Sequence, residues 1–309
     1  MELSILLIDQ IVIQFIMMIV GFLLVKIKLI DDYGTTALSK LVLYVIMPCS
    51  ILKSFQIQIS NELVKSLGVA LVAAALINIL FLVTAYLLKK PLKLDEVEQA
   101  SLTYSNCSNL ILPLVEATLG EEWLIYCCPY ILVQNIIFFT IGTAAIRGEK
   151  KLQLRKVLNI NSIIIFLGIF LLVTQIQLPE MGSSVVDSFA NMIAPASMMV
   201  IGMSIGNANF KKAFLNPRNY CLCFIRLILM PTIFICLVKV SGICYLLDGL
   251  KPVMLIVLMA AASSSAAMVT QTVRCYGKNS EKASILNMMT VLFLIITMPL
   301  MVMIFEKVV

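Results

Sequence analysis

Long runs of apolar residues without a charged side chain recur along the whole chain of 309 residues. Residues 66–88, 157–179 and 283–305 are three of them, and each exceeds the ~20 residues that a helix needs to cross about 30 Å of hydrocarbon. A membrane β-barrel needs short segments of alternating polarity, and these runs are too long and too uniformly apolar for that pattern. We therefore predict an all-α membrane protein with ten transmembrane helices. The predicted spans are residues 4–25, 36–55, 63–88, 97–119, 122–146, 157–177, 184–206, 218–239, 252–274 and 281–305.

The charge content supports a membrane protein and predicts its orientation. Charged residues make up 13% of the chain and hydrophobic residues 61%, whereas a soluble domain carries about 25% charged residues. Most of the 23 Lys and Arg residues fall into the loops on one side of the ten spans, and such an excess marks the cytoplasmic side. The bias predicts a multi-pass protein of the cell membrane with both termini outside. It also accounts for the net charge of +6 without nucleic-acid binding.

A basic run at residues 147–156 divides the chain into two halves with five spans each. We interpret it as a cytoplasmic linker between a first repeat, residues 1–146, and a second repeat, residues 157–309. A partner-binding loop is the alternative for the basic run. Because five is an odd number, the second half must enter the membrane from the opposite side, so the two repeats are expected to be inverted.

An Ile-x-Pro-x-Ser pattern occurs at the same place in both halves. It includes Pro48 and Ser50 in the second span, and Pro195 and Ser197 in the seventh. A proline bends or breaks a helix because it lacks an N–H and clashes with the preceding turn. We interpret the four residues as bends in a scaffold, with a contribution to the binding site as the alternative.

The fourth span carries a polar cluster in its middle. Asn106 and Asn109 share a helix face because they are three residues apart. Pro113 cannot donate to the carbonyl of Asn109, so the helix is expected to break at Asn109 and Leu110. In lipid an unpaired backbone group is costly, and a break persists only where it lines a protein or water cavity. We predict Asn106, Asn109 and Pro113 as substrate-binding residues, with a simple proline kink as the alternative.

The ninth span carries three consecutive hydroxyls, Ser263, Ser264 and Ser265, among small residues. Both polar clusters lie about 15–18 Å deep at 1.5 Å per residue, which is near the membrane midplane. Interrupted helices that enter from opposite faces and meet at the midplane form the binding site of inverted-repeat transporters. We therefore add the three serines to the predicted site. A packing surface for another helix is the alternative.

Polar side chains in the neighbouring spans are further candidates. Gln134 and Asn135 in the fifth span could bond the freed backbone of the fourth span or line the cavity. The matching positions of the tenth span are less polar, with Asn287 near its start. Arg226 lies about two turns into the eighth span. It either extends to the inner interface or serves as the counter-charge for an anion.

The chain lacks residues for several kinds of chemistry. It contains no histidine, and its nine cysteines have no zinc-like spacing. We predict no metal, no cofactor and no enzymatic activity, because an intramembrane hydrolase needs a Ser–Lys, paired-Asp or His–metal arrangement at depth. Asp9 and Glu116 lie near predicted outer ends. The absence of a carboxylate pair at the midplane argues against a cation exchanger that binds its ions on buried acids.

The motifs resemble those of the auxin efflux carrier family in its bacterial form, whose members include proteins described as malonate transporters. The resemblance runs over nearly the whole chain. It rests on the Leu-Tyr-Val-Ile-Met-Pro sequence that ends at Pro48, on residues 106–120, on Ala-Pro-Ala around Pro195 with Ile-Gly at 201–202, and on Tyr-Gly at 276–277.

The resemblance implies ten helices in two inverted repeats, with interrupted helices 4 and 9 that cross and helices 1, 2, 6 and 7 as a scaffold. By position it places Asn106, Asn109 and Pro113 at the crossing. The chain departs from the family in two places. Ile111 and Leu112 stand where a glycine is usual, and Ser263–Ser265 stand where the ninth helix usually has a proline.

We predict a secondary transporter that exports a small carboxylate by alternating access. Helix N-termini at the two breaks suit an anion, and an inside-negative potential drives anions outward at about 2.3 kcal/mol per charge per 100 mV. Proton- or sodium-coupled uptake and a non-transporting receptor are the alternatives. The expected partners are the organic anion and the bilayer, and a homodimer is left open.

Overall fold

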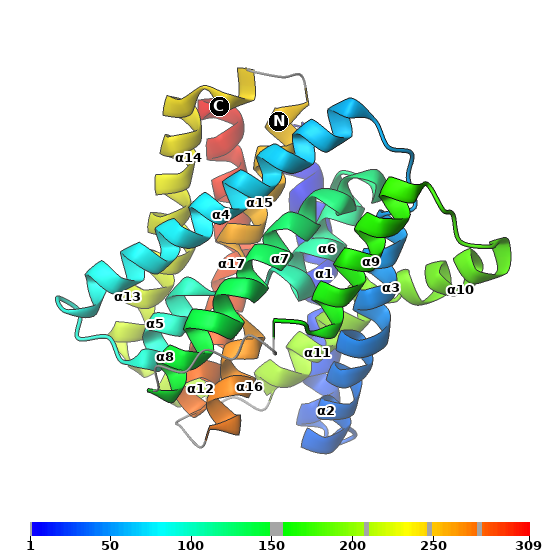
Figure 1. The fold of residues 1–309 in the computed structure, drawn as a ribbon. Coiled ribbons are helices and arrows are strands. Elements are labelled where there is room, and N and C mark those ends of the chain that lie inside the picture. The colour runs from blue at the N-terminus through cyan, green and yellow to red at the C-terminus, as the bar shows by residue number, and fades with distance from the viewer. Residues whose placement is uncertain (1, 149–156, 207–209, 246–248, 277–279) are drawn as a thin grey trace.

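The computed structural model describes residues 2–148, 157–206, 210–245, 249–276 and 280–309. The described residues form a bundle of helices, and the two termini lie at the same end of it (Figure 1). The predicted linker 147–156 falls almost entirely outside the described residues, which include only its first two positions.

The first half contains five helical stretches, several of which change helix type along their length. Its elements are α1 (Glu2–Lys26), α2 (Asp32–Leu41), η1 (Val42–Ile46), α3 (Met47–Ser54), α4 (Asn61–Lys89), α5 (Glu96–Thr103), α6 (Cys107–Thr118), η2 (Glu121–Cys127), α7 (Cys128–Ile137), η3 (Phe138–Gly142) and α8 (Thr143–Arg147).

The second half repeats this order with an additional short helix before its third stretch. Its elements are α9 (Ile160–Thr174), α10 (Glu180–Ala190), α11 (Ile193–Gly206), α12 (Phe210–Leu215), α13 (Pro217–Phe224), η5 (Ile225–Leu229), α14 (Met230–Ser241), η6 (Ile243–Tyr245), α15 (Leu250–Ala262), α16 (Ala267–Cys275) and α17 (Ser280–Val308).

Within the described residues, seven helical stretches are long and apolar enough to cross a membrane by length and composition. They are Asp9–Lys26, Asp32–Ser54, Asn61–Lys89, Glu121–Arg147, Glu180–Gly206, Pro217–Ser241 and Ser280–Val308. The helices α9 and α15 are apolar but shorter. The predicted fourth span is divided between α5 and α6, so helical segments occupy each of the predicted ranges.

Two prolines are accommodated by π-helical turns. Pro48 follows η1, where the N–H of Met47 bonds to the carbonyl of Val42, five residues back. Pro231 follows η5, where the N–H of Met230 bonds to the carbonyl of Ile225. A proline removes one intrahelical hydrogen bond, and a local π turn re-pairs the neighbouring groups without ending the helix.

The predicted seventh span, residues 184–206, is not one continuous helix. It consists of α10 and α11, with residues 191–192 in a turn between them. Pro195 lies in the first turn of α11 and is exposed, where a missing N–H costs little. Figure 1 shows α10 at the side of the bundle, where it packs against α3. Lys53 of α3 fixes it there through Asp187 at 3.8 Å.

The helices α1 and α11 pack with their backbones in close contact. A Cβ atom at Gly202 would lie 1.9 Å from the carbonyl oxygen of Met18, and one at Gly21 would lie 2.2 Å from that of Met199. Small residues permit such an approach, which is a main source of helix association in lipid.

Gly202→Ala is therefore expected to destabilise the protein by about 1–3 kcal/mol, because its methyl group would meet backbone that cannot move aside. Thermal unfolding in detergent measures the change. Gly68→Ala is the matched control, since nothing lies within 4 Å of a Cβ at that helical position. An unchanged unfolding temperature for Gly202→Ala would show that α1 and α11 can separate without loss.

Candidate functional site

The two helix breaks meet in the interior of the bundle. Residues 104–106 separate α5 from α6, and residues 263–266 separate α15 from α16. Ser105 and Ser265 form an antiparallel bridge. The N–H of Asn106 donates to the carbonyl of Ser264 at 2.8 Å, and the N–H of Ala266 donates to that of Tyr104 at 3.0 Å. We call these two segments the crossing.

Side chains from two other helices complete the hydrogen bonding of the crossing. The Gln134 Oε1 atom accepts from the N–H of Ser105 at 2.9 Å, and its Nε2 atom donates to the Ser105 carbonyl at 2.8 Å. On the other side, the Thr290 hydroxyl accepts from the N–H of Ser265 at 3.0 Å. Gln134 lies on α7 and Thr290 on α17, so each break is held by the helix that follows it in the chain.

Gln134 fulfils the first of its two predicted roles, bonding the backbone of the broken helix, and Asn135 beside it is buried. Thr290 was missed. Asn287 is the polar residue that the sequence suggests near the start of the last span, but Thr290 follows Ser265 by 25 residues, which is one helical turn less than the 29 residues between Ser105 and Gln134. That spacing is the signal that could have identified it.

The predicted position of the first break is wrong. Pro113 lies inside α6, which begins at Cys107, and the chain is interrupted at residues 104–106 instead of at Asn109. A proline removes a single bond from a helix that has already started. The extended segment, by contrast, is held by bonds to residues 264 and 134, and these are long-range contacts. Pro113 is buried in α6 and is not part of the crossing.

The second break forms without a proline. Ser263 has φ −67° and ψ 168°, so the chain becomes extended directly after α15. The ninth span is therefore interrupted although it lacks the proline that is usual there in the family. Pairing with the first segment and with Thr290 replaces the bonds that the helix gives up.

Hydrogen-bond donors without an acceptor gather at the crossing. The Asn106 Nδ2 atom and the hydroxyls of Ser263, Ser264 and Ser265 are buried and have no partner. Asn106 is the N-cap residue of α6, and its Oδ1 atom accepts from Asn109 Nδ2 at 3.1 Å. The helices α6 and α16 both begin directly after the two segments of the crossing, so their N-termini lie there. Helix N-termini and unpaired donors together favour a negatively charged ligand.

Arg226 lies close to the same region and does not extend to the interface. Its side chain is 1% exposed, and none of its three guanidinium nitrogens has a hydrogen-bond partner. The guanidinium stacks 5.0 Å from the ring centre of Phe81. The π-helical turn that carries Arg226 packs against α5 and α15, the two helices that end at the breaks.

The four residues of the Ile-x-Pro-x-Ser patterns lie on α3 and α11. Both helices pack against α6, but none of the hydrogen bonds of the crossing involves Pro48, Ser50, Pro195 or Ser197. The hydroxyls of Ser50 and Ser197 are buried without a partner. The helices that carry these residues thus pack against the broken helix, whereas the residues themselves take no part in the hydrogen bonds described for the crossing.

A cavity lined by residues of α4 and α5 reaches the first break. It has a volume of about 370 Å³, and Thr103 and Tyr104 lie in its wall together with Gln99 and Glu96 of α5. Pockets of about 300–1,000 Å³ suit small ligands. Tyr104 is therefore both a residue of the crossing and part of the cavity wall, and its ring packs edge-on against Phe138 at 4.8 Å between ring centres.

A buried charge cluster holds the start of α5. Glu98 is 1% exposed and accepts from Arg218 of α13 at 2.6 Å and from Lys282 of α17 at 2.9 Å. Arg218 also donates to the carbonyl of Leu92 at 2.8 Å. Breaking a buried ion pair is strongly destabilising, so this cluster fixes the first half of the broken helix to α13 and α17.

These features define the chain as a helical membrane protein with two interrupted helices that meet in its interior. A family model described as "Membrane transport protein" matches residues 6–157 and matches again at residues 147–302. The chain belongs to this family, which is the auxin efflux carrier family, and the two matches show an internal repeat. No curated protein matches the sequence.

Proposed function

We propose that the protein carries a small organic anion across the cell membrane by alternating access, with the crossing as its binding site. The observation that carries the proposal is the set of buried donors without acceptors around Asn106, Ser263–Ser265 and Arg226. An unpaired buried polar group costs about 1–3 kcal/mol. A carboxylate would accept hydrogen bonds from several of these donors at once.

We propose ten membrane-spanning segments in two inverted halves. Support comes from the repeated family match and from the antiparallel pairing of the two broken helices. Gln134 and Thr290 bond equivalent serines from the helix that follows each break. With five spans in each half, and Lys and Arg concentrated in the loops of one side, both termini are expected outside.

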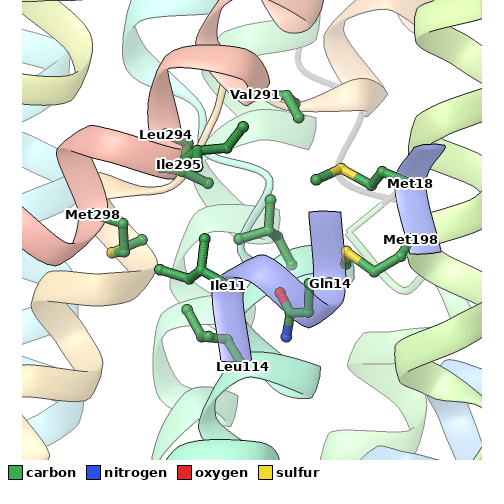
Figure 2. Close-up of a pocket in the computed structure, with 10 residues that line it drawn as sticks. Ile11, Gln14, Met18, Leu114, Met198, Val291, Leu294, Ile295 and Met298 are labelled. Carbon is green, nitrogen blue, oxygen red and sulfur yellow. The ribbon is translucent and has the colours of Figure 1, made fainter. Parts of the chain in front are cut away.

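Alternating access requires one part of the bundle to slide against another. Figure 2 shows a small cavity where α1 and α11 face α6 and α17. Its wall is apolar except for Gln14, whose Nε2 atom has no partner. Ile11, Met18, Leu114 and Met298 are among the apolar side chains. Such a surface has few directional bonds to break, so it suits movement of the broken helices against α1 and α11.

Counterflow in liposomes tests the proposal. Liposomes with purified protein are loaded with lactate, pyruvate, malonate or succinate, and uptake of the same labelled anion is followed. At least one anion is expected to accumulate transiently. Asn106→Ala is expected to weaken this accumulation, whereas Asn61→Ala, at an exposed position of α4, should leave it unchanged. Binding without counterflow for every anion would instead indicate a receptor.

A further inference from the structure

Arg226 differs from every other charged side chain in the described residues. Arg226 and Glu98 are the two that are buried there, and Glu98 is paired with Arg218 and Lys282. The three guanidinium nitrogens of Arg226 are buried and have no hydrogen-bond partner among the described residues. An arginine keeps its proton in proteins, so the interior near the crossing holds a permanent positive charge.

The surroundings compensate this charge only in part. The aromatic face of Phe81 at 5.0 Å contributes a cation–π interaction, which is weaker than the cost of removing an ion from water. All three nitrogens still lack an acceptor. The π-helical turn that carries Arg226 packs against α5, α15 and α17. These are the helices that form or hold the crossing, so the charge belongs to the same unit as the proposed binding site.

We propose that Arg226 supplies the fixed positive charge for the bound carboxylate, so that the loaded carrier is electrically neutral and the empty carrier is the charged form. This inference rests on the proposed function and specifies its substrate as a singly charged anion. One guanidinium balances one carboxylate. A doubly charged anion would leave the loaded carrier with a net charge of −1.

The charge balance determines which step responds to the membrane potential. During export, the loaded site moves outward with −1 from the anion and +1 from Arg226, so this step transfers no net charge. The empty site then returns inward with the charge of Arg226, and an inside-negative potential favours that return. Each cycle still moves one negative charge outward, but the potential acts on the return step.

Two assays on the wild-type protein separate these steps. Exchange with the anion saturating on both sides uses only the loaded carrier, whereas net efflux into anion-free medium also needs the empty return. The anion that gives counterflow is measured at zero potential and at about −100 mV inside. We expect the exchange rate to stay the same and net efflux to rise several-fold, up to about 50-fold if the charge crosses the whole field.

Two variants test the role of the side chain itself. Arg226→Lys keeps the charge, and its exchange is expected to remain independent of potential. Arg226→Gln removes the charge, so its exchange should be lost or should slow at negative potential, because the loaded carrier then bears −1. The melting temperature and a monodisperse gel-filtration peak show whether each variant is folded.

The outcomes distinguish this inference from the proposed function. Absence of counterflow for every anion rejects the proposed function. Counterflow combined with wild-type exchange that depends on potential as strongly as net efflux rejects the inference alone. Exchange by Arg226→Gln that remains as fast as the wild type and independent of potential also rejects it. The comparison of exchange with net efflux in the wild-type protein tests the inference even if Arg226→Gln fails to fold.

Discussion

Replacing Gln134 with Leu is expected to abolish transport and to lower the stability of the protein by about 2–6 kcal/mol. Gln134 is the partner of both the N–H and the carbonyl of Ser105. Gln134 and Ser105 are fully buried, and each unpaired buried group costs about 1–3 kcal/mol. Without Gln134, the extended segment at 104–106 keeps only its pairing with the second segment, which leaves both backbone groups of Ser105 without their side-chain partner. Counterflow and thermal unfolding of the purified variant measure the two effects.

A control for the Gln134 variant is available on α16. Gln271 is exposed, and Gln271→Leu should therefore lower counterflow and stability much less than Gln134→Leu does. If Gln134→Leu keeps the wild-type unfolding temperature and transport rate, then the hydrogen bonds to Ser105 do not maintain the crossing.

Replacing Thr290 with Val is expected to remove most transport activity and about 1–3 kcal/mol of stability. The Val side chain has nearly the shape of Thr but cannot accept the N–H of Ser265, which is then left unpaired. Thr290→Ser keeps the hydroxyl and should restore much of the activity. Initial rates of counterflow, compared at equal amounts of protein in the liposomes, measure the loss.

Thr297 provides a matched control on the same helix. Both threonines donate to the carbonyl four residues back, Thr290 to Leu286 and Thr297 to Phe293, but only Thr290 also accepts from the crossing. Thr297→Val should therefore have little effect. Equal losses in the two variants would show that the bond within the helix matters and the bond to Ser265 does not.

The sequence suggests several residues of the candidate site but not the hydrogen bonds that join them. The sequence places Asn106 and Ser263–Ser265 at similar depths and suggests that Gln134 bonds a freed backbone. The local proline rule, however, put the break at Asn109, because it considers one helix at a time. The actual break depends on its pairing with the segment between α15 and α16, and this pairing is a property of the assembled bundle.

The positions of the Thr290 and Arg226 side chains also depend on how the helices pack and not on the sequence of one helix. Thr290 and Asn287 are three positions apart on α17, and only the way in which that helix packs decides which one reaches the crossing. Arg226 could extend its charge to the interface or bury it, because its side chain is long and flexible. In the folded protein its guanidinium packs on the ring of Phe81, which lies on α4, so the burial of Arg226 depends on contact with another helix.

The sequence by itself determined that this is a helical membrane protein of the auxin efflux carrier family with an internal repeat and polar clusters in two apolar segments. The helical membrane class follows from hydrophobicity and composition, which act locally along the chain, whereas the family and the repeat follow from short motifs that recur at set positions. The tertiary structure decided where the helices break, which side chains hold the breaks and which donors stay unpaired. Each of these depends on hydrogen bonds between distant segments, because a backbone group freed in one helix must find its partner in another.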